Sequence, residues 1–145
     1  MPKRFIYKNV VAWQGEKKGQ LTAQDKDSLM VATPPEFRGH PGIWSPEDLF
    51  VAAVNGCIMT TFLYFIEQKN IQIASYESEA EGVLEIKDKW LVFSQVNVKP
   101  TVVVNTPDQV KQVEDILLQS EKKCLISKSI KAEVTVIPDI KMANQ

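Results

Sequence analysis

The chain has 145 residues, the size of one domain, and 44% of them are apolar, which is enough to build a hydrophobic core. Its formal charge of −1 provides no basic surface and argues against a nucleic-acid partner. The N-terminus does not resemble a signal peptide and no repeat or long linker divides the sequence, so we expect a single cytoplasmic domain over residues 1–145.

Short strand patterns occupy the first part of the chain. Residues 4–14 place apolar side chains on one side, and residues 19–25 and 28–33 are further candidate strands separated by a turn. A loop rich in proline and glycine, residues 33–42, follows and leads into a long apolar segment.

The long apolar segment carries the signals of a helix start. Ser45 is a typical N-cap, Pro46 suits the first helical position, and Glu47 and Asp48 lie in the positive first turn. The residues that follow, as far as Ile66, are apolar on nearly every side, as in a buried central helix or a membrane span. Because polar residues interrupt the run and no second candidate span exists, we expect a helix buried in protein and no membrane association.

The second half of the chain predicts two long strands, a helix and a final strand. Residues 76–86 alternate exposed glutamates with other side chains, and residues 90–104 continue as a strand after a short turn. A second helix is expected to start near Thr106 and Pro107. Apolar residues at every second position over residues 132–136 indicate the last strand.

This order of elements predicts an α+β fold in which antiparallel sheets wrap two long helices. The apolar central helix has more surface to cover than one small sheet can provide. We therefore expect a second copy of the chain to cover the rest and predict an obligate homodimer.

The only two thiols of the sequence, Cys57 and Cys124, each fall on the apolar side of a predicted helix. Inert core packing is the commonest role for such residues. A structural disulfide is disfavoured in a reducing compartment, and one histidine with two distant cysteines supplies too few ligands for zinc. Inert core and a redox pair remain as the two interpretations.

Three segments carry a family resemblance: Pro34–Phe37, reading PPEF; Gly42–Cys57, reading GIWSPEDLFVAAVNGC; and Glu121–Ser127, reading EKKCLIS. They resemble the signature of the OsmC/Ohr family, which comprises osmotically induced protein C and the organic hydroperoxide resistance proteins. The OsmC-like branch is the most similar, and the resemblance extends over essentially the whole chain.

The resemblance implies an OsmC-like fold in a cytoplasmic, intertwined homodimer that needs no cofactor. It implies a thiol peroxidase that reduces organic hydroperoxides and, more slowly, hydrogen peroxide. Such an enzyme takes its electrons from an external thiol. By the same resemblance Cys57 is the peroxidatic thiol, Cys124 the resolving thiol, and Glu47 the family's site glutamate. The family commonly has proline after the second cysteine, where this chain has Leu125.

A buried thiol in the middle of a helix has a raised pKa, so Cys57 is expected to need a nearby cation. The arginine that the family often carries between its first two strands is absent, which leaves Lys17, Lys18 or Arg38 as candidates. Glu47 lies ten residues before Cys57, about 15 Å along one helix. If glutamate and cation approach Cys57, we expect them to come from the partner subunit.

Other residues have simpler interpretations. Phe37, Trp44, Phe50 and Met59 are candidates for an apolar substrate pocket, although aromatic residues near a helix start are more often core. His40 lies in the loop rich in proline and glycine, where no partners for a catalytic triad are visible, and is assigned no catalytic role. Two further functions stay open: a non-catalytic module that binds an apolar ligand, and a thiol redox sensor.

Overall fold

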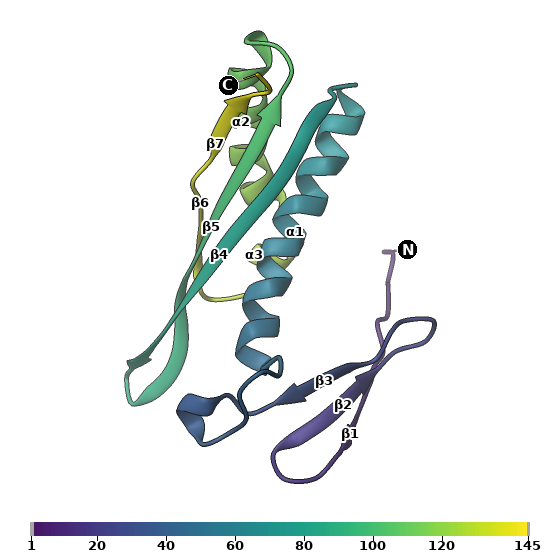
Figure 1. The fold of residues 1–145 in the computed structure, drawn as a ribbon, viewed down its shortest axis with the longest axis vertical. Coiled ribbons are helices and arrows are strands. Elements are labelled where there is room, and N and C mark those ends of the chain that lie inside the picture. The colour runs from purple at the N-terminus through teal and green to yellow at the C-terminus, as the bar shows by residue number, and fades with distance from the viewer. Residues whose placement is uncertain (1, 145) are drawn as a thin grey trace. The chain divides into compact units, whose positions relative to one another are not determined.

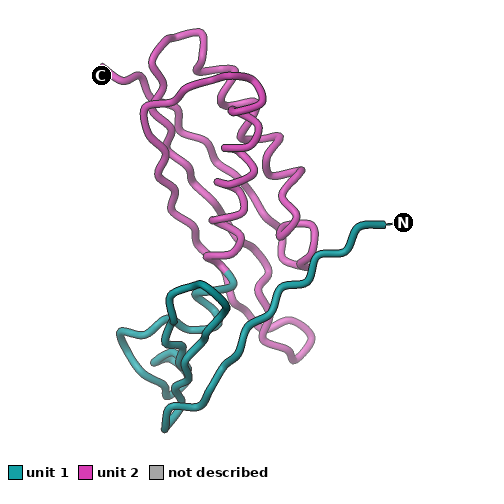
Figure 2. The backbone as a smooth tube through the Cα atoms, turned by 90° about the vertical axis from the view of Figure 1, so that its right-hand side faces the viewer, with its two compact units in different colours: residues 1–50 teal, residues 51–145 magenta. Residues whose placement is uncertain are grey.

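In a computed structural model, residues 2–144 of the protein are described, and the chain forms two compact units, residues 1–50 and residues 51–145 (Figure 2). The elements follow the predicted order of strands, helix, strands, helix and strand (Figure 1). The α+β fold class is therefore confirmed. The expectation that residues 1–145 form a single domain stays a prediction.

The first unit contains a three-stranded antiparallel sheet. Its strands are β1 (Val10–Trp13), β2 (Lys18–Thr22) and β3 (Leu29–Ala32), in the order β1-β2-β3. The predicted first strand, residues 4–14, was too long, because β1 pairs with β2 only from Val10, which lies opposite Thr22 at the end of β2. A short 3₁₀ helix, η1 (Pro35–Phe37), which the sequence did not predict, follows β3.

Helix α1 (Pro46–Gln68) starts where the sequence predicts. The Ser45 hydroxyl accepts a hydrogen bond from the backbone N–H of Asp48 at 3.0 Å, and the Asp48 carboxylate accepts one from the backbone N–H of Ser45 at the same distance. This reciprocal pair is a capping box, which satisfies backbone donors that the first turn leaves unpaired.

The second unit is built on a long hairpin. Strands β4 (Ile73–Lys87) and β5 (Trp90–Val104) pair antiparallel along most of their length. Asp88 and Lys89 connect them with φ angles of 49° and 74°, the left-handed pair that a tight hairpin turn requires.

Two short strands complete this sheet, and both run parallel to β5. They are β6 (Glu133–Val136) and β7 (Asp139–Met142), the second of which the sequence did not predict. The sheet is therefore mixed, whereas the prediction was antiparallel throughout. A helical crossover separates β5 from β6, and such a connection returns the chain in the same direction.

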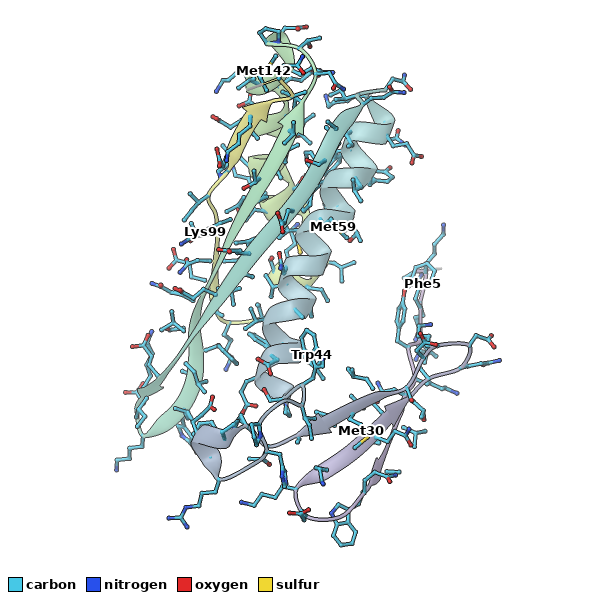
Figure 3. The ribbon with its side chains drawn as sticks, in the orientation of Figure 1. Phe5, Met30, Trp44, Met59, Lys99 and Met142 are labelled. Carbon is cyan, nitrogen blue, oxygen red and sulfur yellow. The ribbon has the colours of Figure 1, made fainter. Side chains whose placement is uncertain are left out.

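One face of this sheet forms the core. From Val96 to Val104 every second residue of β5 is buried, and α1 and α2 (Asp108–Lys123) each bury one stripe. The core positions of the three elements are Val96, Val98, Pro100, Val102 and Val104 on β5; Val54, Ile58, Phe62 and Ile66 on α1; and Val113, Ile116, Leu117 and Ser120 on α2. The other face of the sheet carries charged residues, among them Lys99 (Figure 3).

Helix α1 packs on the sheet along its single buried stripe. By length and composition it is the one helix among the described residues that could cross a membrane, and only 22% of its most apolar window is buried within the chain. The predicted burial on all sides is thus not achieved by one chain, because a sheet can cover only one side of a helix. The expected absence of a membrane partner stays a prediction.

The chain leaves the helical conformation at one residue between two helices. Helix α2 ends at Lys123, Cys124 is extended with φ −66° and ψ 118°, and the four-residue helix α3 (Leu125–Lys128) follows. The sequence placed Cys124 on the helix itself, because the apolar spacing continues across the break.

Gly82 is expected to be essential to the packing of β4 on α1. A Cβ atom at this position would lie 2.5 Å from Val51 Cγ2 and 2.9 Å from Phe93 Cε1. We expect Gly82→Ala to lower the free energy of unfolding by about 1–3 kcal/mol, the usual cost of overpacking a core. Urea denaturation, monitored by circular dichroism, measures this free energy of unfolding. The adjacent Glu81→Ala, on the exposed side of the strand, should change it by less than about 0.5 kcal/mol.

Candidate active site

Cys57 and Cys124, 67 residues apart in the sequence, lie side by side in the second unit. Cys57 is in the middle of α1 and partly exposed, whereas Cys124 is completely buried between α2 and α3. Both are free thiols, and each shifts the pKa of the other. The structure thus brings together the two residues that the sequence singled out.

The break at Cys124 gives its sulfur a structural role. Cys124 is the N-cap of α3, and its Sγ accepts a hydrogen bond from the backbone N–H of Ser127 at 3.5 Å. An N-cap side chain satisfies a backbone donor that the first helical turn leaves free. The position of this sulfur is therefore fixed by the start of α3.

Four hydrogen-bonding groups act on the pKa of Cys57, and one of them, the Thr61 hydroxyl, lies 3.9 Å from the sulfur. Burial is the largest single influence on its pKa and raises it, but these hydrogen bonds together outweigh burial, so the pKa of Cys57 is lowered. In decreasing order of effect, the donors are the Cys124 thiol, the backbone N–H of Ile126, the Thr61 hydroxyl and the backbone N–H of Leu125. Donors of this kind favour the thiolate.

The pKa of Cys124 is displaced in the opposite direction. Burial raises it most, the hydrogen bond to Cys57 raises it further, and the negative charge of Cys57 adds to the effect. The side chain and backbone of Ser127 act against this rise. Of the two thiols, Cys57 is therefore the one that ionises first.

No charged side chain of the described residues contributes to the lowered pKa of Cys57. Hydrogen-bonding groups of this chain lower it instead, and the cation that the sequence predicts from the partner subunit stays a prediction. Two of these hydrogen-bonding groups are backbone N–H groups at the start of α3. The N–H of Leu125 exists only because this chain lacks the proline that the family commonly has at that position.

Glu47 lies in the first turn of α1. Its neighbour Asp48 forms the capping box, so Glu47 is not needed there. The Oε1 atom of Glu47 is buried and has no hydrogen-bond partner in the described part of the chain. A buried carboxylate oxygen without a donor is costly, and such groups usually find a partner.

Arg38 follows η1 in the left-handed conformation, with φ 62°, and its side chain is exposed. The other two candidate cations already have partners in the first unit. Lys17 donates to the backbone carbonyl of Arg38 at 2.9 Å, and Lys18 pairs with Glu16 at 3.3 Å. His40, which was assigned no catalytic role, accepts a weak hydrogen bond through Nε2 from the backbone N–H of Lys17 at 3.4 Å.

The first unit contains an open, mainly apolar hollow of about 400 Å³. It is lined by residues of the sheet, including Val11, Trp13 and Val31, with Lys17 and Lys18 at its edge. Phe37, Trp44, Phe50 and Met59, the residues predicted for an apolar pocket, do not line it. Among residues 2–144 no three His, Cys, Asp or Glu side chains are grouped to hold a metal ion.

Sequence reasoning missed the donors around the two sulfurs. Thr61 follows Cys57 by four residues, one helical turn, and Ser127 follows Cys124 by three, the spacing of an N-cap partner. Both spacings are visible in the sequence. The backbone N–H groups of α3 have no sequence signature of their own.

A protein-family model, described as OsmC-like protein, matches residues 39–139. The chain belongs to this OsmC/Ohr family. The matched segment contains both cysteines and Glu47, whereas Lys17, Lys18 and Arg38 lie before it. A comparison with curated proteins finds no match.

Solved structures of OsmC-like proteins share the fold. An OsmC-like protein of unknown function from Vibrio cholerae has a TM-score of 0.84 and 20% identity, with 93% of this chain and 99% of that chain covered. An organic hydroperoxide resistance protein OsmC from Legionella pneumophila has a TM-score of 0.69 and 19% identity, with 95% of this chain and 99% of that chain covered. An organic hydroperoxide resistance protein from Elizabethkingia anophelis has a TM-score of 0.72 and 15% identity, with 97% of this chain and 99% of that chain covered.

Replacing Leu125 tests whether its N–H helps to hold the Cys57 thiolate. Proline is well tolerated at the first position of a helix, and the extended Cys124 is compatible with a following proline. We expect Leu125→Pro to raise the pKa of Cys57, so that its iodoacetamide alkylation begins at higher pH, while Leu125→Ala leaves the profile unchanged. The measurement is alkylation against pH, read for each cysteine by peptide mass spectrometry. Equal profiles for the two variants would contradict the assignment.

Proposed function

We propose that this protein is a thiol-dependent peroxidase that reduces organic hydroperoxides. The observation that carries the proposal is the pair of neighbouring thiols in which the pKa of Cys57 is lowered and that of Cys124 is raised. Peroxide reduction by two thiols needs one nucleophilic thiolate and one thiol held in reserve beside it. Two similar folds belong to proteins named for organic hydroperoxide resistance, which agrees with this chemistry.

In the first step the Cys57 thiolate attacks the terminal oxygen of the hydroperoxide. The S–O bond forms, the O–O bond breaks, and the leaving alkoxide takes a proton to become an alcohol, so that Cys57 becomes a sulfenic acid. In the second step the Cys124 sulfur attacks the Cys57 sulfur. The S–S bond forms and the sulfenic oxygen leaves as water with the proton of the Cys124 thiol.

The resulting disulfide is restored by an external thiol reductant, which supplies two electrons and two protons. No cofactor enters this scheme. We infer a cytoplasmic location, because the cycle depends on a supply of reduced thiols. Hydrogen peroxide is proposed as a slower substrate.

We propose roles for Glu47 and Arg38 at a site completed by a second copy of the chain. The unpartnered Oε1 of Glu47 and the exposed side chain of Arg38 support this, since a carboxylate and a guanidinium are natural partners. In this proposal Arg38 provides positive charge near the partner's thiol pair and Glu47 holds it in place.

The peroxidase is tested by adding one equivalent of cumene hydroperoxide to reduced protein and counting free thiols over seconds. We expect two thiols to be lost per peroxide, and more slowly with hydrogen peroxide. Cys57→Ser should abolish the loss. Cys124→Ser should still form a sulfenic acid that dimedone traps, but no disulfide.

Two other outcomes would contradict the proposal. Thiols that survive excess oxidant would indicate a module that keeps the fold to bind an apolar ligand. Slow oxidation of both thiols without turnover, accompanied by a change in structure, would indicate a redox sensor.

The proposed homodimer is tested through the uncovered side of α1. Leu63 and Tyr64 are 39% and 59% exposed on this otherwise apolar helix. We expect sedimentation to give twice the mass of one chain, and Leu63→Arg to produce monomers because a charge cannot be buried in an apolar interface. Gln119→Arg, on the exposed side of α2, should remain dimeric. Full peroxidase activity in the monomer would contradict the proposed roles of Glu47 and Arg38 across the interface.

A further inference from the structure

A hydroxyl-bearing residue lies beside each of the two sulfurs, Thr61 beside Cys57 and Ser127 beside Cys124. Thr61 Oγ1 lies 3.9 Å from Cys57 Sγ, within the range of hydrogen bonds to sulfur. A threonine inside a helix usually bonds back to a carbonyl of the preceding turn. Thr60 does so, donating to the carbonyl of Cys57 at 3.2 Å. The Thr61 hydroxyl is directed at the sulfur instead.

Ser127 meets Cys124 through its backbone and brings a free hydroxyl to the same place. Its backbone N–H donates to Cys124 Sγ at 3.5 Å, and its side chain also lowers the pKa of that thiol. The Ser127 Oγ is buried and makes no hydrogen bond of ordinary geometry in the described part of the chain. Ser129, two residues later, bonds the carbonyl of Leu125 at 2.7 Å and is exposed. The buried Ser127 hydroxyl is therefore available to the Cys124 sulfur.

We propose that Thr61 and Ser127 are positioning residues that divide the reaction between the two thiols, Thr61 holding Cys57 ready for the first step and Ser127 assisting Cys124 in the second. This inference rests on the proposed peroxidase function. Neither residue touches the peroxide in this scheme; each acts through a sulfur. The two hydroxyls therefore affect different steps of one cycle.

The electrostatics of the pair explain why the steps occur in this order. While Cys57 is a thiolate, its negative charge and its hydrogen bond keep Cys124 protonated. When Cys57 becomes a sulfenic acid, that charge is gone, and the part of the raised pKa of Cys124 that depends on it disappears. The N–H and hydroxyl of Ser127 then stabilise the negative charge that develops on Cys124 as its proton leaves with the sulfenic oxygen.

Stopped-flow measurement with cumene hydroperoxide separates the two steps, following sulfenic acid formation and then disulfide formation. We expect Thr61→Val, which keeps the shape and removes the hydroxyl, to slow the first step roughly two- to tenfold, the value of one hydrogen bond. We expect Ser127→Ala to slow the second step by a similar factor and to leave the first unchanged. Thr61→Ser and Ser127→Thr, which restore a hydroxyl, should recover most of the rate.

Matched controls lie next to each residue. Thr60→Val and Ser129→Ala remove hydroxyls of the same kind that bond to carbonyls and do not face a sulfur. Each of these two control variants should carry out sulfenic acid formation and disulfide formation at the wild-type rates. If Thr60→Val slows the first step as much as Thr61→Val, or Ser129→Ala slows the second as much as Ser127→Ala, the inference is wrong.

A second readout is independent of peroxide chemistry. The pH profile of alkylation, resolved for each cysteine, should move upward for Cys57 in Thr61→Val and for Cys124 in Ser127→Ala. If the wild-type protein fails to reduce peroxide but these profiles move, the peroxidase is overturned and the assignment of the hydroxyls stands. If wild-type protein turns over peroxide and neither rates nor profiles change, the assignment of the hydroxyls is overturned.

Discussion

The meeting of the two sulfurs depends on one residue leaving the helical conformation. Cys124 is extended between α2 and α3, so α3 begins a new set of unpaired backbone N–H groups beside it. Three successive groups act on the sulfurs: those of Leu125 and Ile126 lower the pKa of Cys57, and that of Ser127 donates to Cys124. A continuous helix would have used these N–H groups in its own backbone hydrogen bonds. The break thus provides the donors that allow a partly buried thiol to ionise.

The other side of the pair is held by the packing of α1 on the sheet. The close approach of Val51 to Gly82, the ring contact of Phe62 with Tyr76 at 5.4 Å, and a hydrogen bond from Asn55 to the carbonyl of Ser78 fix the rotation of the helix about its axis. With that face against β4, Cys57 and Thr61 come from another side of α1. The core therefore determines which side chains of this apolar helix are available for chemistry.

Periodicity and capping signals predicted most of the elements. Ser45, Pro46 and Asp48 define the start of α1, and alternation defines β4 and β5, because these signals are local. The parallel direction of β6 and β7 depends on tertiary packing and was missed. The position of Cys124 was wrong for a related reason, since buried spacing continues through a break that leaves no proline or glycine in the sequence.

The two thiols of the candidate site could be named from the sequence, but their donors could not. A cation was expected because a charged side chain is the one kind of support that residue types reveal. Within one chain the groups that lower the pKa of Cys57 are hydroxyl, thiol and backbone groups, which are neutral, and the charge proposed for Arg38 comes from a second copy of the chain. Neutral donors stabilise whichever sulfur bears the negative charge, which suits a pair of thiols that are to react one after the other.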